Sequence, residues 1–348
     1  MDKTYFEILL EEQPYFKEAL YDLVDKAGKE NLEVEYAETF AENVYKLYPS
    51  IGKLFYIDPA KDTSTARELQ GTTLNIFYQV YHFLKFGKKV FRLTDNLVEN
   101  LMATEMGKVP ADLIRMPFGT IYFSIGEQHI QILDPRTGYH RVTGIFVTTK
   151  DINQNLTLLR FLACGKANKA SKHTLDDSVY FFQIMLDRTK PLEEAVSVTG
   201  DPIEYSDEVV KSYYTQIKTI CHFIFNVLLY ITSKEFRTDF AYRHAPSIDT
   251  SKLKSKSKIR KRNKKANKIS KLPYYSIGDE ITISVYNKEG LRGDMPIDKK
   301  FHYSYRFVVH GHWRHYTDRN NGKPKWIKPY YKGPTIGDIV DKNYKVDL

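Results

Sequence analysis

Cysteine is scarce in this sequence. Its 348 residues include only Cys164 and Cys221, each inside an apolar run. So few thiols argue against a disulfide-rich secreted domain and favour a reducing compartment with buried thiols, although one disulfide between the two stays open. They also provide no cysteine-based metal-binding motif.

Long hydrophobic runs and common enzyme signatures are lacking as well. No stretch approaches 18 uninterrupted apolar residues, and the start, MDKTYFEILLEEQPYF, lacks the basic segment and apolar core of a signal peptide. We therefore expect a cytoplasmic protein that does not contact a membrane. The sequence also has no P-loop, paired-glycine dinucleotide loop or GxSxG elbow. This argues against the common nucleotide-driven enzymes, and we expect no cofactor and no metal.

What the chain does contain is enough apolar material for a buried core. Hydrophobic residues make up 42% of it, and the first 110 residues space them by three and four, as helices do. Helices are predicted over residues 15–27, 35–47, from about 65 to 87, and 94–103. From residue 114 the period changes to two, which predicts five strands. These cover residues 116–125, 128–133, 139–149, 155–163 and 178–185.

The connections between these strands are short, which favours an antiparallel meander of about five strands. A short helix is predicted over residues 191–197. Residues 207–236 predict the longest helix, whose wide apolar face suits packing across a sheet. The fold class is therefore α+β, with a helical N-terminal part, a central mostly antiparallel sheet packed by a long helix, and a C-terminal β-hairpin. We divide the chain into a helical region (1–110), a central sheet with its long helix (111–250), a basic flexible loop (251–272) and C-terminal strands that complete the central domain (273–348).

The formal net charge of +9 is concentrated in one tract. Residues 252–271 carry eleven lysines and arginines and no acidic residue, so +9 less 11 leaves about −2 for the rest. Such a tract cannot bury an apolar face, which favours a solvated linker. It also neutralises phosphates without reading sequence, so RNA or ribosome contact is the alternative. Its candidate binding residues are Lys258, Arg260, Lys261, Arg262, Lys264 and Lys265.

Histidine and tryptophan are concentrated near the end of the chain. Residues 301–333 hold four of the ten histidines and both tryptophans. The two-residue period of 303–315 predicts a strand, and 325–331 predicts a returning strand that places Trp326 near Trp313. One face of the first strand is aromatic and apolar and includes Trp313. The other face carries Arg306, His310, His312 and Arg314.

Several roles fit this cationic face. Histidines two apart on a strand lie about 7 Å from each other, which suits a general acid and base on a phosphate, with arginine neutralising charge. The same side chains suit phosphate or carboxylate binding without chemistry, zinc ligation with further ligands, or a polar network that braces the hairpin. The pattern leaves these open. We assign no catalytic residue and take Arg306, His310, His312 and Arg314 as candidate binding residues.

The order of the motifs resembles a known family. The chain resembles a phage and mobile-element family in the order of its parts. A strand follows Met116-Pro117, and a long helix and a lysine-rich interruption come later. Ile277-Gly278 is then followed by Arg306, Gly311-His312-Trp313 and Trp326. Its best-known members are type V-A anti-CRISPR proteins. The Gly-His-Trp core is the most specific element, and the likeness covers roughly residues 116–333 without the N-terminal helices. Members usually carry arginine before Gly-His-Trp, where this chain has His310.

The resemblance implies a function that the residues alone do not supply. It implies that the chain suppresses production of the type V CRISPR effector nuclease in the host bacterial cytoplasm. Recognition would be of the nuclease's nascent N-terminal polypeptide during translation, followed by loss of its mRNA. The partners implied are a nascent peptide or protein target and, through the basic tract, RNA or the ribosome. Met116, Pro117, Gly311, Trp313 and Trp326 are the motif residues.

Two other functions compete with this one. The first is a metal-independent, toxin-like ribonuclease, with His310 and His312 as acid and base and Arg306 and Arg314 as phosphate clamps. The second is a structural or scaffold protein, in which the hairpin only braces the fold.

Overall fold

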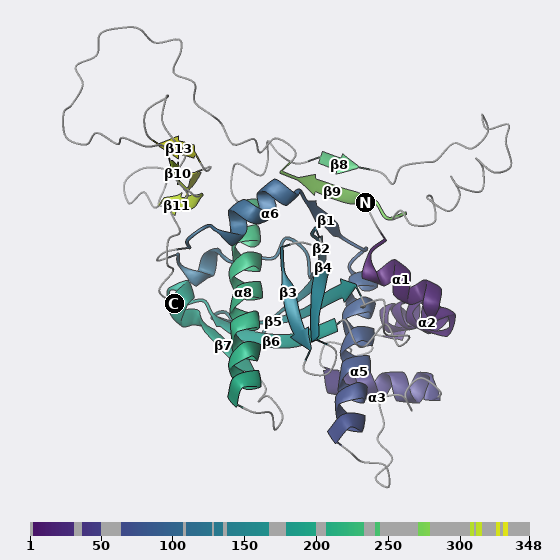
Figure 1. Cartoon of the computed structure of the whole chain (residues 1–348). Coiled ribbons are helices and arrows are strands. Elements are labelled where there is room, and N and C mark those ends of the chain that lie inside the picture. The colour runs from purple at the N-terminus through teal and green to yellow at the C-terminus, as the bar shows by residue number, and fades with distance from the viewer. Residues whose placement is uncertain are drawn as a thin grey trace, which may run out of the picture.

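The structure is a computed structural model of the whole chain (Figure 1). The residues that it describes are 3–30, 37–49, 64–106, 109–126, 129–134, 138–166, 179–199, 207–232, 241–243, 271–278, 307–309, 311–314, 325–327 and 330–332.

The helices and strands follow the predicted order closely. The helices are α1 (Tyr5–Glu12), α2 (Pro14–Glu30), α3 (Ala37–Leu47), α5 (Ser64–Lys85), α6 (Asp95–Met102), a 3₁₀ turn (Ala111–Leu113), α7 (Leu192–Ala195) and α8 (Asp207–Thr232). The strands are β1 (Val90–Leu93), β2 (Thr120–Ser124), β3 (Gln131–Asp134), β4 (Gly138–Asp151), β5 (Leu156–Lys166), β6 (Val179–Asp187), β7 (Val196–Thr199), β8 (Ala241–Arg243), β9 (Tyr274–Ile277), β10 (Phe307–Val309), β11 (His312–Arg314), β12 (Lys325–Ile327) and β13 (Tyr330–Lys332). The fold class is α+β, as predicted.

The central sheet is larger than the predicted meander. It has nine strands in the order β7-β6-β5-β4-β2-β1-β9-β8, with β3 also paired to β4. The predicted antiparallel core runs from β2 to β6, and β7 extends it. The prediction of about five strands was wrong because β1 lies between β2 and β9 and is parallel to both. Strand β1 has four residues, too few to show a period.

The short helix after β6 ends earlier than predicted. Helix α7 stops at Ala195, and the chain continues directly into β7. Residues 196 and 197, which the pattern placed in the helix, are therefore in a strand. The sequence of β7, Val-Ser-Val-Thr, is rich in the β-branched side chains that favour extended backbone.

Helices cover both faces of the sheet (Figure 1). Because alternate residues of a strand point to opposite faces, Ile121 and Phe123 pack into the cluster that contains α6 and α8, while Tyr122 between them packs against α1, α2, α3 and α5. The apolar face of α8 lies across the sheet as predicted. No helix in the described ranges is long and apolar enough to span a membrane.

A glycine on β4 makes room for the buried hydroxyl of Tyr122 on the sheet face that packs against α1, α2, α3 and α5. A Cβ atom on Gly144 would lie 1.9 Å from the hydroxyl oxygen of Tyr122. Tyr122 is 1% exposed, and its hydroxyl accepts a hydrogen bond from the backbone N–H of Tyr5 at 3.4 Å. Burial raises the pKa of Tyr122 well above its ordinary value. Strand β4 thereby helps to hold α1 against the sheet.

Candidate functional site

The C-terminal hairpin has the predicted pairing in its described parts. Strand β10 pairs with β13 and β11 pairs with β12, both antiparallel, and Trp313 lies directly opposite Trp326. The two ladders share one register, since two residues on each strand lie between the pair Val309↔Tyr330 and the pair His312↔Ile327. The prediction that the returning strand places Trp326 near Trp313 is confirmed.

Trp313 anchors the hairpin to the long helix. It is 6% exposed, and its indole Nε1 donates to Oδ1 of Asn226 on α8 at 2.9 Å. The amide nitrogen of Asn226 lies 3.1 Å from the carbonyl oxygen of Leu101 and 3.0 Å from that of Thr104, at the end of α6. One fully buried amide therefore joins α6, α8 and β11. Breaking such a network costs more than a typical hydrogen bond because its partners are left unpaired away from water.

His222 completes this network one helical turn before Asn226. Its Nε2 lies 3.1 Å from the amide nitrogen of Asn226, whose two hydrogens are shared among this acceptor and the carbonyl oxygens of Leu101 and Thr104. The acceptor role requires the neutral imidazole. Burial lowers the pKa of His222, partly opposed by a hydrogen bond with the backbone of Thr104. The environment therefore favours the neutral form that the network needs.

Trp326 fills the space beneath Gly311. It is 1% exposed, and its ring meets Tyr230 of α8 edge to face at 5.2 Å between centroids. A Cβ atom on Gly311 would lie 3.0 Å from Trp326 Nε1 and 3.1 Å from Thr104 Oγ1. Close packing against α6 and α8 therefore explains why the motif has a glycine and two tryptophans at these positions.

The outward face of β11 carries two of the four predicted binding residues. His312 is half-buried and Arg314 is exposed, on either side of buried Trp313. A parallel β-bridge also joins the backbone of His312 to Glu105. Arg306 and His310 lie outside the described residues. The acid–base pair of the ribonuclease hypothesis needs His310 with His312, so it stays a prediction.

The earlier motif residues pack on the same side of the sheet as the hairpin. Met116 and Ile277 belong to the cluster that contains both tryptophans, and Pro117 is exposed beside Met116. Gly278 has a φ of +86°, and a Cβ atom there would lie 2.6 Å from Thr94 Oγ1. This position therefore requires glycine for backbone conformation and for space.

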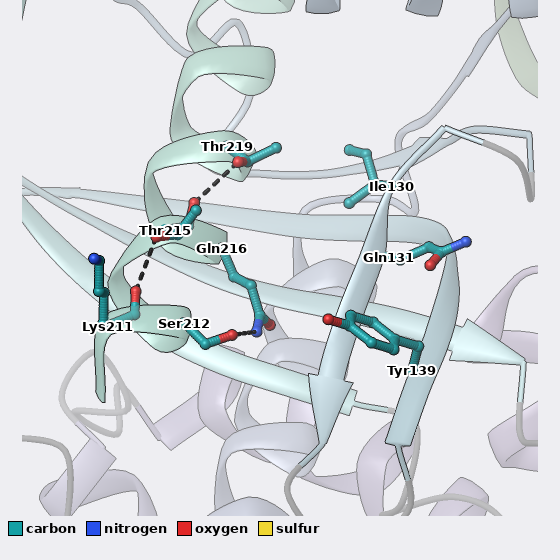
Figure 2. Close-up of a pocket in the computed structure, with 8 residues that line it drawn as sticks. All are labelled: Ile130, Gln131, Tyr139, Lys211, Ser212, Thr215, Gln216 and Thr219. Atoms are coloured by element: carbon teal, nitrogen blue, oxygen red, sulfur yellow. Dashed lines mark hydrogen bonds between the residues drawn. The ribbon is translucent and has the colours of Figure 1, made fainter. Parts of the chain in front are cut away.

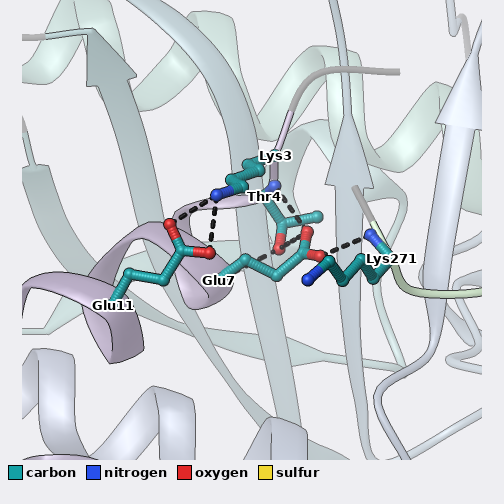
Figure 3. Close-up of polar contacts among 5 residues, drawn as sticks. All are labelled: Lys3, Thr4, Glu7, Glu11 and Lys271. Carbon is teal, nitrogen blue, oxygen red and sulfur yellow. Dashed lines mark hydrogen bonds and ion pairs between the residues drawn. The ribbon is translucent and has the colours of Figure 1, made fainter. Parts of the chain in front are cut away.

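The basic tract lies outside the described residues except for its last residue, Lys271. The backbone N–H of Lys271 donates to Oε1 of Glu7 at 2.6 Å (Figure 3). The other oxygen of Glu7 accepts from the N–H and the hydroxyl of Thr4, each at 3.0 Å, in a capping box at the start of α1. The end of the tract is therefore fixed to α1 just before β9 begins. The six tract residues named above stay candidate RNA contacts.

Asn226 is the site residue that sequence reasoning missed. A signal for it exists, because it is the one polar residue in the apolar run FIFNVLLYI of α8. A polar side chain there must find a buried partner or destabilise the helix packing. No group of three or more histidine, cysteine, aspartate or glutamate side chains in the described ranges is arranged to hold a metal ion.

One protein-family model matches the part of the chain that carries these motifs. The model of the anti-CRISPR type V subtype A2 family matches residues 91–331, from β1 to β13. Among solved structures, the crystal structure of AcrVA2 aligns with 95% of this chain and 98% of its own, at 11% identity and a TM-score of 0.49. No curated protein sequence matches the chain. Because the family match spans well over half of its residues, the chain belongs to the anti-CRISPR type V subtype A2 family.

Proposed function

We propose that this chain recognises the nascent N-terminal polypeptide of the type V CRISPR effector nuclease during translation and lowers the nuclease's mRNA and protein levels. The observation that carries the proposal is the family match over residues 91–331. That range contains most of β1, all of β2–β7, α8 and the hairpin, and the core cluster that includes both tryptophans lies within it. The proposed activity is that of a binding protein.

The hairpin supports this proposal as a rigid platform. Trp313 and Trp326 face the core, so the outward side chains of β11 project from a strand that is fixed to α6 and α8. A binding group on an anchored strand loses less conformational entropy when a partner binds. We propose that Arg306, His310, His312 and Arg314 contact the target from this strand.

The basic tract supplies a second, weaker contact in the proposal. With eleven cationic residues it attracts RNA or the ribosome through phosphates. Lys271 is fixed to α1, so the tract starts from a defined place on the fold. Two linked weak contacts raise the apparent affinity through effective concentration. Neither contact needs base-specific recognition.

Purification of the tagged protein from cells that translate the nuclease tests the proposal. The bound material should be enriched in the N-terminal nascent polypeptide of the nuclease and in its mRNA, relative to an unrelated message at equal abundance. Replacing the six tract residues by glutamine should lower the enrichment and weaken its dependence on salt. The slope of log affinity against log salt concentration should become shallower by about 0.7 for each phosphate that the tract no longer neutralises. Equal recovery of the nuclease message and the unrelated message contradicts the proposal.

The anchoring of Trp313 also favours a bracing role for the Gly-His-Trp motif itself. The two roles separate in one variant, His312→Ala, because His312 faces away from the core. If the motif only braces the hairpin, loss of nuclease mRNA should fall in this variant only as far as its melting temperature falls. If His312 contacts the target, the mRNA effect should fall at an unchanged melting temperature.

A further inference from the structure

The sheet has an open edge next to the long helix. In the part of the chain that the structure describes, β3 pairs with β4 alone. The opposite edge of β3 faces the N-terminal half of α8 across a cleft of about 420 Å³ (Figure 2). The cleft lies away from the hairpin tryptophans, on residues that no motif in the sequence singles out.

Backbone geometry shows which groups of β3 point into this cleft. The N–H of Val142 donates to the carbonyl of Ile130 at 2.9 Å, so Ile130↔Val142 is a hydrogen-bonded pair of the antiparallel ladder. Pairs alternate along such a ladder, so Ile132 also bonds to β4, while Gln131 and Leu133 direct their backbone groups outward. The backbone N–H of Leu133 confirms the pattern, since it donates to the side chain of Gln216 on α8 at 3.1 Å.

Gln216 therefore occupies a place that a backbone carbonyl would take in a further strand. Its Oε1 accepts from Leu133, and its amide nitrogen donates to the hydroxyl of Ser212 at 3.0 Å. A side-chain amide has the same donor and acceptor groups as a peptide unit. An incoming peptide carbonyl can replace it at Leu133 without leaving that N–H unpaired.

The helix side of the cleft offers few groups of its own. The hydroxyls of Thr215 and Thr219 each bond to the helix carbonyl one turn earlier, both at 2.9 Å (Figure 2). This leaves the backbone edge at Gln131 and the 67% exposed ring of Tyr139 as the main contact groups. The arrangement suits pairing with an extended main chain better than recognition of a sugar or a base.

We propose that an extended polypeptide segment binds in this cleft by adding a strand to β3. The segment exchanges backbone hydrogen bonds with Gln131 and displaces Gln216 from Leu133. Four residues of β3 span about 13 Å, so three or four peptide residues pair with it. Lys211 is the single charged residue among the eight that line the cleft, so an acidic peptide side chain is favoured beside it. The inference rests on the proposed function, because it assigns the nascent polypeptide a site.

Gln131 allows a test that separates backbone from side-chain recognition. Gln131→Pro removes an outward N–H that the β3–β4 ladder does not use, and proline is tolerated at such edge positions. Gln131→Ala removes the side chain and keeps the N–H. The probe is a ribosome stalled while translating the effector nuclease, captured by each variant of the full chain. Melting temperature serves as the folding control.

Strand addition predicts that Gln131→Pro lowers capture at least tenfold while Gln131→Ala changes it less than twofold. Equal losses in the two variants mean side-chain recognition and overturn the inference. Undiminished capture by Gln131→Pro also overturns it, while the proposed function stands. If the wild-type chain captures no nuclease-translating ribosome, the proposed function fails and takes this inference with it.

A second variant keeps the inference testable if Gln131→Pro does not fold. Gln216→Ala frees the N–H of Leu133, so an incoming strand no longer has to displace a hydrogen bond worth roughly a factor of five in affinity. Capture should therefore rise about two- to tenfold. A fall in capture would mean that Gln216 contacts the ligand through its side chain and would overturn strand addition.

Discussion

At the scale of single residues, Asn226 is the point where three elements meet. Its side chain accepts from Trp313 and donates toward Leu101 and Thr104. The amide is fully buried, so water cannot replace any of these bonds. The family motif Gly-His-Trp therefore depends on a residue 87 positions earlier in the chain.

Asn226→Leu tests this dependence. The variant leaves the Trp313 N–H without a partner in a dry environment and removes one donor each from the carbonyls of Leu101 and Thr104, so we expect the free energy of unfolding to fall by about 2–4 kcal/mol. Lys218→Ala on the exposed face of α8 is the control and should change stability by no more than about 0.5 kcal/mol. Urea unfolding measures both. Equal stability of Asn226→Leu and the wild type would show that the network is unimportant.

His222 makes the same network sensitive to acid. Its pKa is lowered in the folded chain, so below the unfolded value of about 6.5 the unfolded chain binds more protons than the folded one. The stabilising contribution is complete above pH 6.5 and is lost as the pH falls through the folded pKa. Each pKa unit by which folding lowers the pKa of His222 corresponds to about 1.4 kcal/mol of unfolding free energy lost at low pH.

We therefore expect that His222→Gln removes part of the loss of stability between pH 7 and pH 5. Unfolding free energies of the two proteins at both pH values give the comparison. Carboxyl groups also make stability depend on pH, as does Asp187, whose pKa is lowered by hydrogen bonds from Thr189. Their contribution is the same in both proteins and cancels in the comparison. An identical pH dependence in both proteins contradicts the assigned role of His222.

At the scale of elements, the hairpin docks through close contact. Gly311→Ala places a methyl group 3.0–3.1 Å from Trp326 and Thr104, so we expect a loss of about 1–3 kcal/mol from overpacking. Gly71→Ala is the matched control, because its Cβ meets nothing within 4 Å inside α5 and alanine favours helix by about 1 kcal/mol. Thermal unfolding should therefore move in opposite directions for the two substitutions. A rise in melting temperature for both would argue against tight docking.

The first helix and the end of the basic tract form a second junction. Glu7→Ala removes the capping box and the acceptor for Lys271, so stability should fall by about 1–2 kcal/mol and trypsin should cleave faster after Lys271. Glu11→Ala removes only an ion pair with Lys3 at the surface (Figure 3) and should cost no more than about 1 kcal/mol, without faster cleavage. Cleavage that is equally fast in both variants would show that Glu7 does not fix the tract.

The elements differ in how far the sequence predicts them. The period of α8 and the alternation of β4 and β5 are long, and they appear in the structure where the pattern places them. The two-residue period and the turn before β12 also predicted the Trp313–Trp326 pair. Strand β1 was missed because four residues between Lys89 and the cap of α6 show no period.

Long-range contacts were beyond the sequence pattern. The hydroxyl of Thr94 donates to the carbonyl of Gly278, 184 residues later, and this places β9 beside β1. Neither the Asn226–Trp313 bond nor the Gln216–Leu133 bond has a local signature, because a single amide side chain does not indicate its partner. The candidate residues of the outward hairpin face followed from alternation, whereas the network that fixes the face did not.

At the scale of the whole molecule, two helical layers enclose one mixed sheet. The family match covers the layer with α6, α8 and the hairpin, and it leaves out α1, α2, α3 and α5. Three candidate contact surfaces lie in different parts of this architecture. They are the open edge of β3, the outward face of β11 and the fixed end of the basic tract. In our proposal the first two contact a polypeptide and the third leads to RNA.

The central claim is that the trigger is the nascent polypeptide and not the message. The most direct measurement is the half-life of nuclease mRNA, with and without this chain, for three versions of the 5′ coding region. These are the natural sequence, a synonymous recoding that keeps the peptide, and a compensated frameshift that keeps nearly all the nucleotides and changes the peptide. We predict a shortened half-life for the natural and recoded messages and an unchanged one for the frameshifted message. A shortened half-life for the frameshifted message, or escape of the recoded one, would contradict the account.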